Sequence, residues 1–171
     1  MIITKERKDF IVFMAECLIG TVIGLVLYRI YPVIGAWCLF SIILVLSPDR
    51  KDAMTLAINR IKANLIGASI GLAISYFHPV SLITMCIGIA VAMAICEWFH
   101  LKAVTKTAIV AILIITMHAP GEYFWNIALE RAFGVMLGCV IGVIITYFFH
   151  IARVHSTRTI QKIRGRFHST R

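Results

Sequence analysis

Two arginines, Arg60 and Arg131, carry the chemistry that stands out in a largely apolar chain of 171 residues. Each begins the same pattern, in which a glycine follows seven positions later and a second glycine eleven positions later. The second copy lies 71 positions after the first. A guanidinium group can bind a carboxylate through two parallel hydrogen bonds. The repeated pattern therefore predicts a carboxylate contact at each mouth of a pathway, with the two arginines near opposite faces of a bilayer.

Other interpretations of these arginines remain open. Each could be a positively charged anchor at a membrane surface. Arg131 could instead form an ion pair with its neighbour Glu130. Asn64 and Lys62 accompany the first arginine, and Asn64 lies one helical turn after Arg60, where it can form a hydrogen bond inside a bundle. Lys62 and Lys106, the latter in a short linker before residues 107–117, would add positive charge on the cytoplasmic side of the candidate pathway, although lysines there also satisfy the charge rule alone.

Glu16 is the deepest acidic residue of the first apolar segment. A charged group at the centre of a membrane helix costs at least about 2.5–3.5 kcal/mol, and less toward the helix ends. The residue is therefore a candidate for coupling protons to transport, or for pairing with a basic side chain. The alternative is a glutamate that reaches water at the membrane surface.

Glycines at intervals of four residues form three stripes along predicted helices. Such stripes let two helix backbones approach closely, which a surface that faces lipid does not require. The predicted helix-packing glycines are Gly20, Gly24, Gly67, Gly71, Gly134, Gly138 and Gly142.

The composition indicates an all-α integral membrane protein, because 60% of the residues are apolar and the mean hydropathy is +0.91. The five cysteines lie in apolar segments without metal-ligand spacing. The sequence also lacks a phosphate-binding glycine loop, a zinc-protease motif and a nucleophile elbow. We expect no enzymatic activity, no cofactor, no metal site and no nucleic-acid partner.

Six membrane helices are predicted within a transmembrane domain of residues 1–149. A basic cytoplasmic tail, residues 150–171, is predicted to follow this domain. Prolines and charged residues separate the apolar segments. The predicted helices cover residues 10–30, 33–46, 61–77, 80–99, 107–117 and 127–149.

The distribution of charge predicts the topology. With six spans, every lysine and arginine except Arg29 and Arg131 falls on the side of the two chain ends. This asymmetry places both termini in the cytoplasm of a multi-pass protein in a bacterial inner membrane. The two copies of the pattern then cross in opposite directions, as a 3+3 inverted repeat. The short helices at 33–46 and 107–117 occupy matching places, which points to a substrate site unless they are simply buried.

The tail carries six basic residues and no acidic residue. We expect it to attract anionic lipid headgroups, at about 1 kcal/mol per basic residue near the surface. Docking of a protein partner is the alternative. The three tryptophans, Trp37, Trp98 and Trp125, are expected at the membrane interface rather than as stacking platforms.

The segment from Tyr31 to Trp37, the charged stretch that leads into Arg60, and the closing residues 128–142 resemble the fusaric acid resistance (FUSC-like) or aromatic acid exporter family. The resemblance implies a six-helix unit that exports organic, often aromatic, carboxylates. The plant aluminium-activated malate transporters are similar in layout and imply an anion pore between protomers. Members usually carry a large cytoplasmic domain or a second membrane unit; this sequence has neither, so we expect a homo-oligomer.

The sequence thus predicts a carrier or channel that exports small organic anions, with proton coupling as an option. The alternative is a non-transporting scaffold or effector that uses its basic tail to dock a partner or anionic lipid.

Overall fold

The structure is a computed structural model, and it describes residues 2–77, 81–101, 104–117 and 124–168. These residues form six α-helices and no strand, which confirms the all-helical prediction. The helices are α1 (Ile2–Ile30), α2 (Pro32–Val45), α3 (Arg50–Phe77), α4 (Leu82–Trp98), α5 (Thr105–Thr116) and α6 (Phe124–His168).

Helix α3 begins well before the apolar segment that the sequence analysis assigned to it. Asp49 explains the start, because its Oδ1 accepts a hydrogen bond from the backbone N–H of Lys51 at 2.9 Å, as N-cap residues do. The first turns are amphipathic. Ala53 and Ala57 are buried, whereas Met54 is exposed. The charged stretch is therefore the first part of the helix.

Helices α1 and α6 also extend beyond their predicted bounds. Helix α1 includes the polar residues from Ile2, and α6 continues without a break from the bundle to His168. No proline interrupts either extension, so a helix can continue after its apolar segment ends. The predicted boundary at residue 149 is thus not an end of regular structure.

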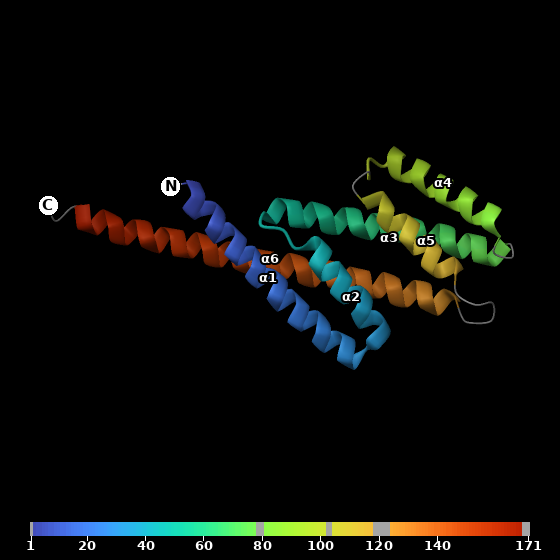
Figure 1. Cartoon of the computed structure of the whole chain (residues 1–171), viewed down its shortest axis with the longest axis horizontal. Helices are drawn as coiled ribbons and strands as arrows, with labels where there is room; N and C mark the ends of the chain where they lie inside the picture. The colour runs from blue at the N-terminus through green and yellow to red at the C-terminus, as the bar shows by residue number, and fades with distance from the viewer. Residues whose placement is uncertain (1, 78–80, 102–103, 118–123, 169–171) are drawn as a thin grey trace.

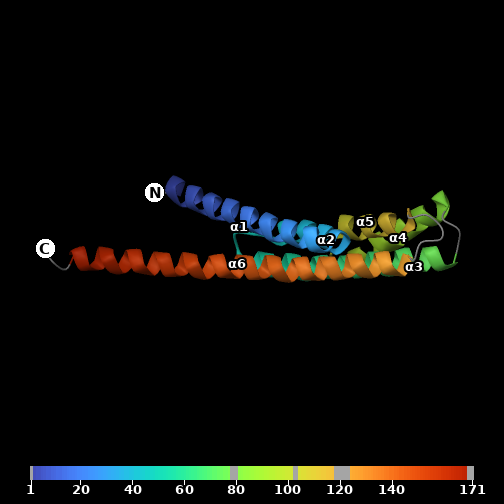
Figure 2. The ribbon, with the colours of Figure 1, turned by 90° about the horizontal axis from the view of Figure 1, so that it is seen from below.

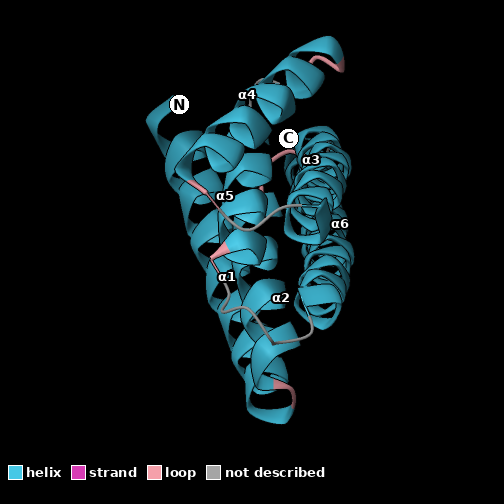
Figure 3. Ribbon diagram, turned by 90° about the vertical axis from the view of Figure 1, so that its right-hand side faces the viewer, coloured by secondary structure: helices cyan, strands magenta, loops and turns pink. Residues whose placement is uncertain are grey.

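The helices form two layers. Helices α3 and α6 run side by side in one layer, and α1, α2 and α5 cross them in a second layer, whereas α4 packs against α3 and α5 (Figures 2 and 3). Helix α1 begins and α6 ends toward the same end of the long axis, and the α1–α2 and α4–α5 hairpins cover different parts of the α3–α6 pair (Figure 1).

The glycines lie where the two layers meet. A Cβ atom added at Gly138 would meet the carbonyl oxygen of Cys38 on α2 and lie 2.6 Å from the Cβ of Ser41. One added at Gly67 would meet the carbonyl oxygen of Ala108 on α5. Helix α2 therefore packs on α6 and α5 packs on α3, through backbones too close to admit a side chain.

The remaining predicted glycines also lie at helix contacts. Gly71 approaches Ile115 of α5, and Gly142 approaches Val45 of α2. Cβ atoms added at Gly20, Gly24 and Gly134 would also meet atoms of α2. The structure thus places all seven glycines against a neighbouring helix.

In the described part of the chain, two helical segments are long and apolar enough to cross a membrane, Phe10–Ile30 and Trp125–Ala152. Pro32–Val45, Leu82–Trp98 and Thr105–Thr116 are apolar but shorter. The 14 residues of α2 extend over about 21 Å, which is less than the roughly 30 Å of a bilayer's hydrocarbon core.

Candidate functional site

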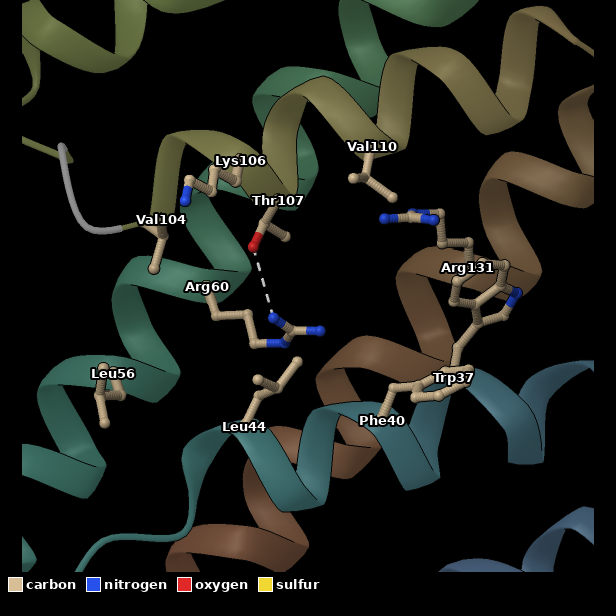
Figure 4. Close-up of a pocket in the computed structure, with 10 residues that line it drawn as sticks. All are labelled: Trp37, Phe40, Leu44, Leu56, Arg60, Val104, Lys106, Thr107, Val110 and Arg131. Carbon is tan, nitrogen blue, oxygen red and sulfur yellow. Dashed lines mark hydrogen bonds between the residues drawn. The ribbon is translucent and has the colours of Figure 1, made fainter.

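A cavity of about 550 Å³ lies between α2, α3, α5 and α6, and both arginines line it. Figure 4 shows their guanidinium groups directed into the same space between α2 and α5. Trp37 and Phe40 come from α2, whereas Lys106 and Thr107 come from the first turn of α5. The short helices α2 and α5 therefore form two walls of the cavity.

Arg131 is the more deeply buried of the two arginines, with an exposed fraction of 2%. Its Nε donates a hydrogen bond to Oδ1 of Asn64 on α3 at 2.9 Å. Its guanidinium carbon lies 4.4 Å from the ring centre of Trp37 on α2, a cation–π contact. Its Nη1 is buried and has no hydrogen-bond acceptor among the described residues. Arg131 and Glu130 both lie in the described part of α6, and they form no ion pair with each other.

Arg60 is only partly buried and is held less closely. Its Nε donates to the hydroxyl of Ser41 on α2, and its Nη1 donates to the hydroxyl of Thr107 on α5, both at 3.4 Å. These distances exceed the usual N–H···O range of 2.7–3.2 Å. Arg60 thus links α2 to α5 across the cavity through two weak hydrogen bonds.

The predicted separation of the arginines to opposite mouths of a pathway is wrong, because the two residues share one cavity. The register of the α3–α6 pair explains this. Asn64, which contacts Arg131, lies one turn from Arg60 on the same helix. The two arginines therefore differ in level by roughly one turn, about 6 Å.

The lysine of the cavity is Lys106 rather than Lys62. Lys62 is exposed on α3 and does not line the cavity, so the prediction that it contributes to the pathway is not matched by its position. Lys106 had been assigned to a linker, whereas the structure places it in the first turn of α5. No periodicity distinguishes the two lysines, since their difference depends on which helix faces the cavity.

Glu16 is buried in α1, with an exposed fraction of 2%, and does not line the cavity. It therefore does not reach water in the single chain, which contradicts the alternative of an exposed glutamate at a membrane surface. Neighbouring Cys17 packs against the core formed by Cys38, Ile42, Leu46 and Ile145. Any effect of Glu16 on the cavity must therefore pass through α2 or α6.

Trp37 is the residue that sequence reasoning missed. We expected all three tryptophans at the membrane interface; Trp98 and Trp125 are exposed on the surface of the single chain. Trp37 instead stacks on Arg131 inside the cavity. One signal was present in the sequence, because Trp37 lies four positions before Ser41 and therefore on the same helix face. In the structure Ser41 contacts Arg60 and Trp37 contacts Arg131.

The cavity combines positive charge with apolar walls. Arg60, Arg131 and Lys106 contribute positive charge, and none of the described residues that line the cavity is acidic. The groups that contact the two arginines are an amide, two hydroxyls and an indole, all of them neutral. Burying a charge without compensation is unfavourable. The arrangement therefore suits an anion with an apolar body. No group of metal-ligating side chains occurs in the described residues.

A comparison with protein families matches the model of the fusaric acid resistance protein-like family over residues 28–145. The matched region includes α2 to α5 and the part of α6 that lines the cavity. Comparisons with curated proteins and with solved structures found no match.

Proposed function

The chain belongs to the fusaric acid resistance protein-like family, and on this premise we propose that it is a membrane carrier or channel that exports organic anions, often aromatic carboxylates. Family membership supports a membrane protein with a transport-related function rather than an enzyme. The shared cavity of Arg60 and Arg131 is the proposed substrate site.

The observation that carries this proposal is the uncompensated charge of Arg131. This arginine is 2% exposed, its described contacts are neutral, and its Nη1 has no acceptor. A bound carboxylate would supply the missing negative charge and two acceptor oxygens. Trp37 and Phe40 would contact the apolar part of the same molecule.

A 3+3 inverted repeat of six membrane helices is the architecture that we propose for this pathway. Its support is the equivalence of the glycine contacts. Gly67 meets Ala111 and Gly138 meets Ser41. The glycines are 71 positions apart and their partners 70. Short helices in matching positions that line a central site are typical of transporters built from inverted repeats.

We propose further that the protein lies in a bacterial inner membrane with both termini in the cytoplasm. The excess of lysine and arginine on the side of the chain ends supports this orientation. So does the arrangement in which α1 begins and α6 ends toward the same end of the bundle (Figure 1). The basic tail would then face the anionic headgroups of the inner leaflet.

A homo-oligomer is proposed because a wall of the cavity lies on the surface of the single chain. Phe40, Leu44 and Val110 line the cavity and are also exposed. A second copy placed against α2 and α5 would cover these side chains. It would also separate the arginines from lipid, which is an unfavourable environment for charge.

Flux of radiolabelled 4-hydroxybenzoate into proteoliposomes tests the proposed function, with protein-free vesicles as the baseline. Arg131→Gln and Arg60→Gln remove the two charges and should each lower the flux at least about tenfold, which corresponds to about 1.4 kcal/mol. Lys62→Gln is the matched control, because it removes an exposed charge outside the cavity. Wild-type flux in both folded arginine variants would exclude the cavity as the substrate site.

A further inference from the structure

We infer that Asn64 is the positioning residue of the cavity, and that it holds Arg131 in place while leaving the arginine's charge available to an anion. The inference rests on the proposed function and deepens it. It assigns to the Asn64 amide a role in setting anion affinity, which is distinct from a role in holding α3 against α6.

The geometry of the Arg131 side chain motivates this assignment. Oδ1 of Asn64 accepts from Nε at 2.9 Å, and the guanidinium carbon lies over the Trp37 ring, 4.4 Å from its centre. These two contacts come from different helices and restrain the group in two directions. The terminal nitrogens are left for a ligand, and Nη1 has no described acceptor. Carboxylates commonly bind arginine in the plane of the guanidinium group.

The neutrality of Asn64 is the second part of the argument. An aspartate at this position would have nearly the same shape and could accept the same hydrogen bond. It would also bring a negative charge into direct contact with Arg131, where the low polarity of the surroundings strengthens the attraction. The protein itself would then neutralise the positive charge of Arg131. An amide restrains the guanidinium group without this compensation.

The second arginine supports the same interpretation, because its contacts are neutral as well. Ser41 and Thr107 accept from Arg60 through hydroxyl groups at 3.4 Å. The residue 71 positions after Asn64 is the apolar Val135, so the second copy of the pattern has no amide there. Only Arg131 is therefore restrained by a close amide contact. Asn64 should affect anion binding through Arg131 and not through Arg60.

A structural role makes the opposite prediction for one substitution. If Asn64 serves only to join α3 to α6, Asn64→Asp preserves the connection and adds an ion pair to it. The variant should then be as stable as the wild type and should transport normally. If the neutral amide keeps Arg131 available, the same variant should fold well and lose affinity for anions.

The experiment compares Asn64→Asp, Asn64→Gln and Asn64→Leu in protein whose Trp98 and Trp125 are both replaced by phenylalanine. Trp37 is then the remaining one of the three tryptophans, and its emission without ligand reports its contact with Arg131. The KM and maximal rate of 4-hydroxybenzoate flux are measured for each folded variant. Asn64→Asp should raise KM at least about tenfold, with Trp37 emission close to that of the wild type.

The other two variants complete the test. Asn64→Gln retains a neutral amide and should keep KM within about threefold of the wild-type value. Asn64→Leu removes the acceptor, so it should change Trp37 emission and also raise KM. If Asn64→Asp does not fold, the other two variants test the role of Asn64 in anion affinity. A higher KM in Asn64→Leu than in Asn64→Gln supports that role, and equal KM values contradict it.

Two results would overturn the inference, and they are distinguishable. A wild-type KM in folded Asn64→Asp would show that the neutrality of the amide is irrelevant, while the proposed function would stand. An absence of 4-hydroxybenzoate flux above protein-free vesicles in the wild type would instead overturn the proposed function, and the inference with it.

Discussion

Arg131 on α6 and Asn64 on α3 are joined by a buried hydrogen bond of 2.9 Å. The bond lies where the two long helices run side by side, one turn from Arg60. It places the arginines of the two repeated patterns about one helical turn apart in level, so that both reach one cavity. Positive charge is therefore concentrated inside an apolar bundle. Such charge is unfavourable there and is usually associated with function rather than with packing.

The distance between neighbouring helix backbones should determine how much stability is lost when each glycine is replaced by alanine. Gly67→Ala and Gly138→Ala would make a methyl group collide with a backbone carbonyl oxygen. In Gly71→Ala and Gly142→Ala the nearest atoms, the Cβ of Ile115 and the carbonyl oxygen of Ile42, lie farther away, at 3.2 Å. We expect the first pair to destabilise the protein by about 1–3 kcal/mol, as overpacking does. The second pair should have a smaller effect.

Thermal unfolding in detergent, followed by circular dichroism, measures this difference. The four variants are matched, because each adds one methyl group on the α3 or α6 glycine positions. Equal melting temperatures for Gly138→Ala and Gly142→Ala would contradict the described approach of α2 to α6.

The end of α4 offers a second prediction about stability. His100 has φ of 55°, a left-handed conformation that favours glycine. The N–H of Leu101 donates to the carbonyl of Cys96 at 2.8 Å, which completes a helix-terminating motif that usually contains glycine. His100→Gly should therefore raise the free energy of unfolding by up to about 1 kcal/mol. His100→Val should lower it, and a melting curve for each variant gives the sign.

Proton coupling through Glu16 can be tested without disturbing the cavity, because this residue does not line it. Glu16→Gln should retain exchange of 4-hydroxybenzoate across vesicles but lose the stimulation of flux by an imposed pH gradient. A fluorescent pH indicator inside the vesicles reports the accompanying proton movement. Glu130→Gln is the matched control, since Glu130 also lies outside the cavity and is only partly buried. Unchanged gradient stimulation in Glu16→Gln would remove this residue from the mechanism.

Deleting residues 153–171 separates the transporter from the scaffold hypothesis. Helix α6 continues through this segment to His168, but all of the cavity residues precede it. The truncated protein should therefore transport 4-hydroxybenzoate at the wild-type rate. It should also lose any thermal stabilisation that anionic phosphatidylglycerol confers relative to neutral phosphatidylcholine. Loss of all flux in a folded truncated protein would favour a docking role for the tail.

The sequence by itself determined that the chain is helical and approximately where each helix lies, because apolar segments and their breaks depend on local composition. It also indicated that Asn64 would form a hydrogen bond inside the bundle, which the contact with Arg131 confirms. The glycine pattern marked the face of each long helix that another backbone approaches. These properties follow from spacing along a single helix.

Only the tertiary structure decided which helix each of those faces meets. A helical period identifies a face but not its partner, so the packing of α2 on α6 and of α5 on α3 could not be derived from spacing. The same reason explains the errors at the site. Of the two lysines only Lys106 lines the cavity, Trp37 contacts an arginine, and the two arginines share one cavity, because long side chains on different helices meet only after the helices have packed.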